Sequence, residues 1–222
     1  MNAPITRRHA VKTVAAAALG PFAGGLAAEI SARIRIGQIG TSHAHASGKM
    51  DAIRSLTDLY EVVGIAEPIA GRQAIAEKQK SFAGVQWMTE EARLADKSVR
   101  AVVVETTLGD SARAARACLH AGKHIHLDKP GAETHAEFKA LRLDAERLGL
   151  TVQMGYMLRY NPAFDLLFRA HREGWFGDIT GIDASMGKLA DARLHKQLAG
   201  IPGHGMFELG CQIGRASCRE RV

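Results

Sequence analysis

Short apolar runs alternate with longer amphipathic stretches between residue 33 and about residue 154. The apolar runs predict strands at 33–39, Val62–Ala66, Gly84–Trp87, Ala101–Val104, His124–Leu127 and Leu150–Met154. The stretches between them predict helices at about 49–56, 70–80, Thr89–Ala95, 110–121 and Thr134–Leu148. Strands that alternate with helices in this way indicate a parallel, doubly wound α/β sheet. We therefore predict one domain of this class over residues 28–155.

Two of the predicted helices have residues suited to their ends. Thr89 precedes one of them, and its hydroxyl is a good N-cap acceptor. The helix that starts near Thr134 is followed by Gly149, and glycine is common at a helix C-terminus because it adopts a positive φ without strain. These residues predict where the two helices begin and end.

The pattern changes after about residue 155. The stretches that follow predict a helix at 162–171, an extended run at 178–186 and a glycine-rich turn entering a helix at 201–212. They indicate the incomplete start of an α+β domain over residues 156–213. Glu208 and Gln212 are four residues apart, so a helix would place both side chains on one face.

The last residues have no periodicity. Residues 214–222 read GRASCRERV, with three arginines close together, and we interpret them as an aberrant tail. A partial sheet leaves unpaired strand edges. We therefore expect the segment after about residue 155 to be poorly stable by itself.

Residues 1–27 have the layout of an export signal. An arginine pair, Arg7 and Arg8, precedes an uncharged run of 15 residues from Val14 to Ala28. A membrane-spanning helix needs about 20 residues, so we expect no stable membrane insertion. The stretch TRRHAVK is similar to a twin-arginine signal, which predicts a periplasmic or exported protein. A cytoplasmic location is the alternative.

The net charge of +6 lies mostly at the two ends of the chain. Residues 1–27 contribute +3 and residues 214–222 contribute +2, which leaves +1 for residues 28–213. Nucleic-acid binding needs a basic patch, and this nearly neutral body gives no reason to expect it. The three cysteines are too few and too widely spaced for a disulfide framework or a close-spaced zinc site.

Candidate chemistry lies where the predicted parallel strands end, because ligands of such sheets bind outside the carboxyl ends of the strands. Thr106 and Thr107 follow one strand, and Asp128, Lys129 and Pro130 follow the next. Lys129 lies between a carboxylate and a proline, which makes it the main candidate for a ligand contact. The alternative is a surface lysine before a proline that starts a loop.

A turn with one glycine follows the first strand. Dinucleotide-binding folds have G-x-G-x-x-G here, because bare backbone lets the pyrophosphate approach a helix N-terminus. Gly40 occupies the first glycine position of this motif, whereas Ser42 and His45 occupy the second and third glycine positions. Gly40, Ser42 and the neighbouring His43 are therefore the candidate contacts of a dinucleotide.

An acidic residue ends the second predicted strand. Glu67 lies 27 residues after Gly40, close to where an acid accepts hydrogen bonds from the adenosine ribose hydroxyls. Its charge would repel a 2′-phosphate, so it predicts NAD rather than NADP, although Arg72 nearby weakens this preference. The alternative is a carboxylate that serves a turn or a helix start.

Four segments match the motifs of one known family. GKHIHLDKP is similar to G-K-H-V-x-x-E-K-P, with Asp128 in place of Glu, and VVVETT is similar to a strand that ends in Thr-Pro. GYMLRYNPAF resembles the segment that leaves the family's nucleotide domain. PGHGMFELGCQ resembles G-G-G-x-x-x-D-x-G-x-H. Over about residues 33–213 the chain thus resembles the Gfo/Idh/MocA family of nicotinamide-dependent sugar and cyclitol oxidoreductases.

The resemblance implies an NAD(P)-binding Rossmann domain followed by a domain with an open, mostly antiparallel sheet. It implies hydride transfer between a nicotinamide cofactor and the CH–OH group of a sugar, polyol or cyclitol-like substrate. Carried over by position, Lys129 binds the reacting hydroxyl and Glu208 takes the place of a substrate-binding Asp. Gln212 takes the place of a catalytic His, but an amide donates a hydrogen bond without accepting the proton near neutral pH.

The implied cofactor contacts combine the strand ends with the first turn. They are Gly40, Ser42, His43, Glu67, Thr106, Asp128 and Lys129. The family would form homo-oligomers through its second domain, which is incomplete here, so we expect this chain not to do so.

Two other functions are compatible with the residues. His43 and His45 form one H-x-H pair and His124 and His126 another, and four convergent imidazoles could bind zinc in a metal-dependent hydrolase. We expect no metal site, because the first pair falls in a turn where both side chains would not share a face. The second alternative is a non-catalytic nucleotide-binding fragment, which would bind NADH without oxidising a polyol.

Overall fold

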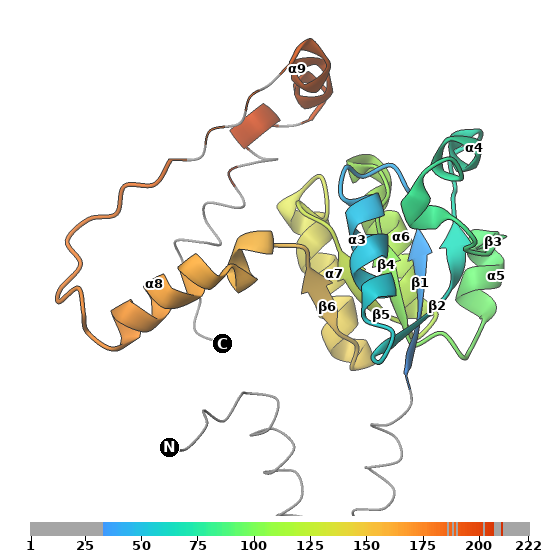
Figure 1. Cartoon of the computed structure of the whole chain (residues 1–222), viewed down its shortest axis with the longest axis horizontal. Coiled ribbons are helices and arrows are strands. Elements are labelled where there is room, and N and C mark those ends of the chain that lie inside the picture. The colour runs from blue at the N-terminus through green and yellow to red at the C-terminus, as the bar shows by residue number, and fades with distance from the viewer. Residues whose placement is uncertain are drawn as a thin grey trace, which may run out of the picture.

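A computed structural model describes residues 33–185, 187, 189, 191–201, 203–206 and 210. Within them, six strands form one sheet in the order β3-β2-β1-β4-β5-β6 (Figure 1). The strands are β1 (Ile34–Ile39), β2 (Tyr60–Ala66), β3 (Trp87–Met88), β4 (Ala101–Val104), β5 (His124–Leu127) and β6 (Val152–Met154). All neighbouring strands are parallel. The strand order reverses between β1 and β4, which confirms the predicted doubly wound α/β class.

Helices cover both faces of this sheet (Figure 1). They are α3 (Ala46–Ser55), α4 (Arg72–Ala76), η1 (Lys80–Phe82), α5 (Glu90–Ala95), α6 (Leu108–His120) and α7 (His135–Leu148). The larger core packs α6 and α7 on β1, β4 and β5. The smaller core packs α3, α4 and η1 on the opposite face. Because the sheet is buried on both sides, its central strands read as continuous apolar runs.

The structure confirms the predicted start of α5 and both predicted ends of α7. The Thr89 hydroxyl accepts a hydrogen bond of 3.1 Å from the Ala92 amide at the start of α5. Thr134 and Glu137 form a capping box at the start of α7. Gly149 ends α7 with a φ of +66°, the left-handed conformation that a C-terminal glycine supplies.

The segment between β2 and β3 differs from the prediction. The helix expected at 70–80 is only α4, five residues long, and it is followed by the short 3₁₀ turn η1. Ala76 is the one buried residue of α4, so this stretch has no apolar face to hold a longer helix. The strand expected from Gly84 starts at Trp87 instead, because Gly84 has a φ of +72°.

After β6 the described chain leaves the sheet. The turn η2 (Met157–Tyr160) leads into α8 (Pro162–Arg172), which confirms the predicted helix and is capped by Asn161. A further helix, α9 (Ala192–Ala199), follows, and both helices extend away from the α/β layers (Figure 1). The described residues of the predicted extended run, 178–185, join no strand. The described part after β6 offers them no strand to pair with, and a lone strand is not stable.

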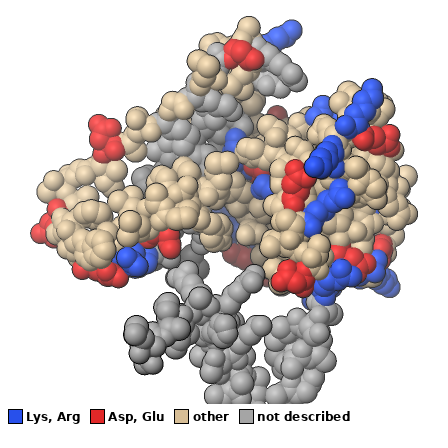
Figure 2. Space-filling view, viewed as in Figure 1, with Lys and Arg blue, Asp and Glu red and all other residues tan. Residues whose placement is uncertain are grey.

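Several predictions lie outside the described residues. These are the signal-like segment, Glu208, Gln212 and the tail 214–222, whose assignments therefore stay predictions. In the part of the chain that is described, we find no helix with the length and apolarity to cross a bilayer. Figure 2 shows acidic and basic side chains interspersed over the α/β layers in this view.

A buried arginine explains two glycines of the sheet. Arg93 of α5 is fully buried, and its guanidinium donates a 2.9 Å hydrogen bond to the Val63 carbonyl. A Cβ atom on Gly37 would lie 2.6 Å from Arg93 Cδ. A Cβ atom on Gly64 would lie 2.5 Å from Arg93 Nη2 and 2.6 Å from the Gln86 carbonyl oxygen. Glycine at both positions makes room for the arginine.

Replacing Gly64 by Ala should lower the free energy of unfolding by about 2–4 kcal/mol, because overlap adds to backbone strain. Gly64 has a φ of +137°, which a residue with a Cβ rarely adopts. Urea unfolding followed by circular dichroism measures the change. Gly48→Ala is the control, since nothing lies within 4 Å of that Cβ position in α3. It should raise stability by about 0.5–1 kcal/mol. Equal stability of wild type and Gly64→Ala would contradict the packing described here.

Candidate functional site

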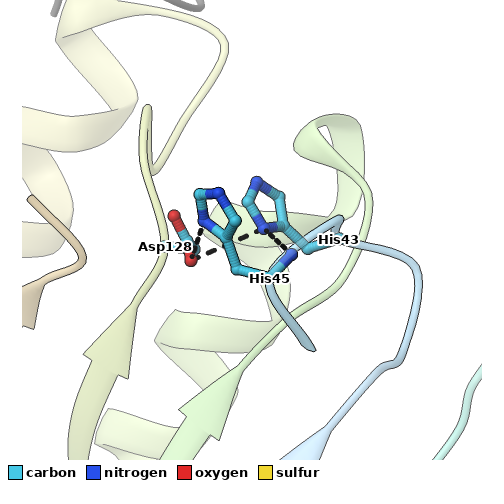
Figure 3. Close-up of side chains that lie close together, drawn as sticks. All are labelled: His43, His45 and Asp128. Carbon is cyan, nitrogen blue, oxygen red and sulfur yellow. Dashed lines mark hydrogen bonds and ion pairs between the residues drawn. The ribbon is translucent and has the colours of Figure 1, made fainter. Parts of the chain in front are cut away.

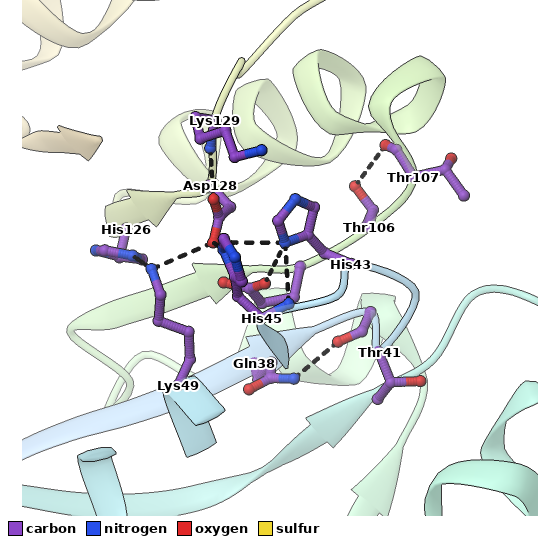
Figure 4. A network of polar contacts seen from close by, with 12 residues as sticks. Gln38, Thr41, His43, His45, Lys49, Thr106, Thr107, His126, Asp128 and Lys129 are labelled. Atoms are coloured by element: carbon purple, nitrogen blue, oxygen red, sulfur yellow. Dashed lines mark hydrogen bonds and ion pairs between the residues drawn. The ribbon is translucent and has the colours of Figure 1, made fainter. Parts of the chain in front are cut away.

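Polar side chains converge where the carboxyl ends of β1, β4 and β5 meet. The segments that follow these strands are 40–45, 105–107 and 128–130, and they lie beside one another at the point where the strand order reverses (Figure 4). We call the ionisable side chains gathered here the switch-point cluster. Its members are His43, His45, Lys49, Glu105 and Asp128. Ligands of open α/β sheets bind in this crevice.

The turn after β1 lies against the backbone that follows β4. Gly40 has a φ of +83°, and a Cβ there would lie 2.9 Å from the Glu105 carbonyl oxygen and 2.8 Å from Thr106 Cγ2. The amides of Ser42 and His43 both donate to that same carbonyl oxygen, each at 3.0 Å. Glycine is therefore required at the first position of the turn, and two of the turn amides bind the protein itself.

Glu67 stands at the carboxyl end of β2, next to this turn. One of its carboxylate oxygens accepts hydrogen bonds from the amide and the hydroxyl of Thr41, at 2.7 and 2.6 Å. The other oxygen accepts from the Ile69 amide at 2.9 Å. Arg72 donates a hydrogen bond of 2.8 Å to the Thr41 carbonyl, so its guanidinium is held by the turn. Glu67 thus has the predicted position, and its carboxylate also braces the turn.

Asp128 is the centre of the cluster. Its side chain is buried, and Oδ2 lies 3.0 Å from His45 Nδ1, 3.5 Å from His43 Nδ1 and 3.3 Å from Lys49 Nζ. Oδ1 accepts a 2.7 Å hydrogen bond from the Lys129 amide. Burial by itself would raise the pKa of Asp128, but the His45 hydrogen bond and the charges of His43 and Lys49 outweigh it. The pKa is therefore well below the ordinary range, and Asp128 is ionised.

Glu105 is a second carboxylate, at the end of the β4 run. Its side chain is fully buried, and neither carboxylate oxygen accepts a hydrogen bond. The closest ionisable group to it is His43, whose Nδ1 lies 3.3 Å from Oε2. Burial raises the pKa of Glu105 and the charge of Asp128 adds to this, whereas His43 lowers it in part. A carboxyl in this setting tends to keep or share a proton.

The structure brings most of the predicted cofactor contacts together. Gly40, Ser42 and His43 lie in the turn, Thr106 touches it, and Asp128 and Lys129 lie across from it (Figure 4). Lys129 is 6% exposed and follows the centre of the cluster directly. The Thr106 hydroxyl donates to the Thr107 carbonyl at 3.2 Å. Glu67 stands apart from this group, on the β2 side of the turn.

The expectation that His43 and His45 would not converge is wrong. Both Nδ1 atoms approach the same oxygen of Asp128, and the two rings pack edge to face with centroids 4.8 Å apart (Figure 3). The turn curls back toward β5 because it is fastened to the Glu105 carbonyl, and this brings both rings to one side. The second pair does not join them. His124 Nδ1 accepts from the Thr151 amide, and His126 reaches the cluster only through Lys49.

Sequence patterns had not identified Glu105 and Lys49 as site residues. Glu105 is part of the motif VVVETT, and an acid directly after four apolar strand residues is a signal of a buried charge. Lys49 lies four residues after His45, on the same side of α3, and this spacing was the available signal.

The residues of the crevice fit a dinucleotide. Gly40 permits the tight turn, and Glu67 lies at the strand end where ribose hydroxyls would bind. The Ser42 hydroxyl oxygen is buried without a hydrogen-bond partner, as a group that awaits a ligand oxygen would be. Ser42 and His45 differ from the glycine pattern, so side chains as well as backbone would border the pyrophosphate.

The chain is similar to members of one known family. The profile of the family GFO_IDH_MocA, described as "Oxidoreductase family, NAD-binding Rossmann fold", matches residues 34–156. An inositol 2-dehydrogenase from Saccharopolyspora erythraea is 30% identical over 151 residues, which are 65% of this chain and 43% of that protein. A 4-carboxy-2-hydroxymuconate-6-semialdehyde dehydrogenase from a Sphingobium species is 34% identical over 70 residues, which are 22% of that protein. The chain thus spans less than half the length of these relatives.

Solved structures share the fold. An NAD-binding protein from Listeria innocua superposes with a TM-score of 0.65 and 21% identity, over 84% of this chain and 54% of that chain. A 3-ketoreductase from Actinomadura kijaniata, in complex with NADP and TDP-benzene, superposes with a TM-score of 0.56 and 26% identity. That match covers 67% of this chain and 45% of the ketoreductase.

Replacing Asp128 by Asn should lower the free energy of unfolding by about 2–4 kcal/mol at pH 7, because it leaves Lys49 beside a neutral amide. The folded-state pKa of Asp128 is lowered, so its stabilisation is present above the unfolded-state pKa of about 3.9 and is lost as the pH falls below it. Urea unfolding at several pH values measures the difference between the two proteins.

The control for this series is Asp58→Asn, which changes an exposed carboxylate. It should alter stability by less than about 0.5 kcal/mol at every pH. The free energies of unfolding of wild type and Asp128→Asn should approach each other below about pH 4. A difference that instead became larger at lower pH would show that Asp128 is not ionised in the folded protein.

Proposed function

The chain belongs to the Gfo/Idh/MocA oxidoreductase family, and we propose from this that it is an NAD-dependent oxidoreductase. In the proposed reaction a hydride passes between the nicotinamide ring and the CH–OH carbon of a sugar, polyol or cyclitol-like substrate. The observation that carries the proposal is the position of Asp128 and Lys129. They follow β5 directly and lie beside the turn that a dinucleotide would occupy.

NAD would be held by the turn and by Glu67. The carboxylate of Glu67 would accept hydrogen bonds from the ribose hydroxyls and would repel the 2′-phosphate of NADP. Arg72, the residue that could have bound that phosphate, donates to the Thr41 carbonyl instead. These contacts support NAD as the cofactor, which supplies the hydride chemistry when bound.

Lys129 would act on the substrate hydroxyl. A lysine ammonium stabilises a developing alkoxide through its charge and a hydrogen bond. Lys129 is 6% exposed, and its amide is fixed by Asp128 Oδ1, so the start of its side chain is well positioned. Glu208 and Gln212 are proposed as substrate contacts on the strength of the family motif alone.

The proposed substrate class follows the named relatives. Curated relatives from Saccharopolyspora and Salmonella are inositol 2-dehydrogenases, with 30% and 26% identity. A ring of adjacent secondary alcohols is therefore the substrate to test first. The proposal concerns the whole protein's activity, to which the part after β6 would contribute substrate contacts.

The wild-type chain should bind NADH at least about 10-fold more tightly than NADPH, a difference of about 1.4 kcal/mol. Glu67→Gln should reduce this ratio to about 3-fold or less, because the amide no longer repels the 2′-phosphate. Quenching of protein fluorescence during titration gives both dissociation constants. Glu77→Gln, an exposed change at the end of α4, should leave the ratio unaltered. Wild-type protein that bound NADPH as tightly as NADH would refute the role given to Glu67.

Lys129→Met should lower kcat for NAD-dependent oxidation of myo-inositol, or of the best substrate in a panel of cyclitols and sugars, by at least about 100-fold. The dissociation constant for NADH should rise by far less than kcat falls, because the proposed main contact of Lys129 is with the substrate hydroxyl. Lys139→Met removes an exposed lysine of α7 and should retain full activity. If wild-type chain binds NADH but oxidises nothing in the panel, it is a non-catalytic nucleotide-binding protein and the proposed activity is wrong.

A further inference from the structure

Three potential metal ligands gather at one point of the switch-point cluster. His43, His45 and Asp128 each place a ligand atom within 4.8 Å of the other two (Figure 3). His45 Nδ1 lies 3.0 Å from Asp128 Oδ2, and His43 Nδ1 lies 3.5 Å from it. Two ligands of a tetrahedral zinc ion are about 3.3 Å apart, given bonds of about 2.0–2.1 Å. The two separations from Asp128 Oδ2 are close to that spacing, and all three ligand atoms lie within 4.8 Å of one another.

The Nδ1 atom of His43 faces several polar atoms at once. It accepts a hydrogen bond of 3.3 Å from the His45 amide, which requires a lone pair on this atom. The same atom lies 3.3 Å from Glu105 Oε2 and 3.5 Å from Asp128 Oδ2, and both of these oxygens also carry lone pairs. A cation bound between Nδ1 and these two oxygens would replace the His45 amide as the partner of the nitrogen lone pair, and all three atoms would then face one positive charge.

Glu105 gives a second, independent indication of a ligand. Its carboxylate is 0% exposed, neither of its oxygens accepts a hydrogen bond, and one of them reaches His43. Buried polar groups are almost always paired, and an unpaired carboxylate is among the most costly to bury. Metal coordination is one of the few ways to compensate such a group.

We propose that His43, His45 and Asp128 bind a divalent transition metal of the zinc class, next to Glu105, whose Oε2 lies 3.3 Å from His43 Nδ1. Two imidazoles and carboxylate oxygens suit Zn²⁺ and its neighbours in the first transition row, whereas Mg²⁺ and Ca²⁺ prefer oxygen ligands alone. Both imidazoles would coordinate through Nδ1, so their protons would be on Nε2. The rings are 17% and 32% exposed, so an ion can reach the site from solvent.

Lys49 is the charge that competes with the metal. Its ammonium lies 3.3 Å from Asp128 Oδ2 and also contacts His126. The lysine is 25% exposed and lies in the second turn of α3, so its long side chain can turn toward solvent when a metal binds. In the metal-free protein, the ammonium of Lys49 supplies the positive charge beside Asp128 that the metal ion would otherwise supply. This site does not depend on the proposed oxidoreductase activity.

The test is a zinc titration of the full chain after treatment with a chelator. Competition with a chromophoric chelator, together with elemental analysis, should show one zinc per chain bound with a dissociation constant of about 1 μM or below. His45→Ala and His43→Ala should each weaken binding by at least about 30-fold, because each removes a ligand. His120→Ala removes an imidazole that is 54% exposed and lies on α6, and it should bind zinc like the wild type.

Two further measurements exclude other causes. Cys211→Ser with Cys218→Ser removes the thiols outside the described residues, and zinc binding should persist in this variant.

His45→Gln keeps the size of the side chain without an imidazole nitrogen, so it serves if His45→Ala fails to fold. Zinc should raise the melting temperature of the wild type and leave that of His45→Gln unchanged. Absence of binding at 100-fold higher zinc, binding that survives both histidine changes, or its loss in the cysteine variant would each overturn the proposal.

Discussion

The close approach of the first turn to the backbone after β4 determines where the imidazoles of the switch-point cluster lie. Gly40 allows this approach because it has no Cβ, and the Glu105 carbonyl then accepts the amides of Ser42 and His43. With the turn fastened there, its two imidazoles face the end of β5 rather than solvent. The same contact places the turn over the point where strand order reverses, where ligands of these sheets bind. One steric constraint thus selects both the path of the chain and the location of its chemistry.

Charge in the crevice follows from that geometry. Asp128 and Glu105 are both buried at strand ends, and the side chains that face them come from the turn and from α3. Their environments shift the two pKa values in opposite directions. The pKa of Asp128 is lowered by its hydrogen bond and by nearby cations, whereas burial raises the pKa of Glu105. Pairs of titratable groups with diverging pKa values are typical of functional sites.

The start and end of a strand were predicted best where its apolar run is flanked directly by polar residues or by a turn. Ala101–Val104 and His124–Leu127 have the predicted bounds, because each run ends at polar residues or at the turn that follows a helix. The segment between β2 and β3 was predicted poorly, since its apolar residues do not form one buried face. At the site, the motifs identified Gly40, Glu67, Asp128 and Lys129 as strand-end residues. They could not show that His45 and Glu105 reach the same place, because the path of a turn depends on long-range packing that periodicity does not encode.

The proposed metal and the proposed cofactor would share the crevice, and their binding would therefore be coupled. In the metal-free protein the ionised Asp128 lies beside the ammonium of Lys49, so these two charges offset one another next to the turn. A divalent cation on His43, His45 and Asp128 would add positive charge beside the turn, where Ser42 and His45 replace the glycines of the usual pattern. Side chains and a cation would then perform the task that bare backbone performs elsewhere. Because such coupling is reciprocal, NAD would bind more tightly to the zinc form by the same factor by which it tightens zinc binding.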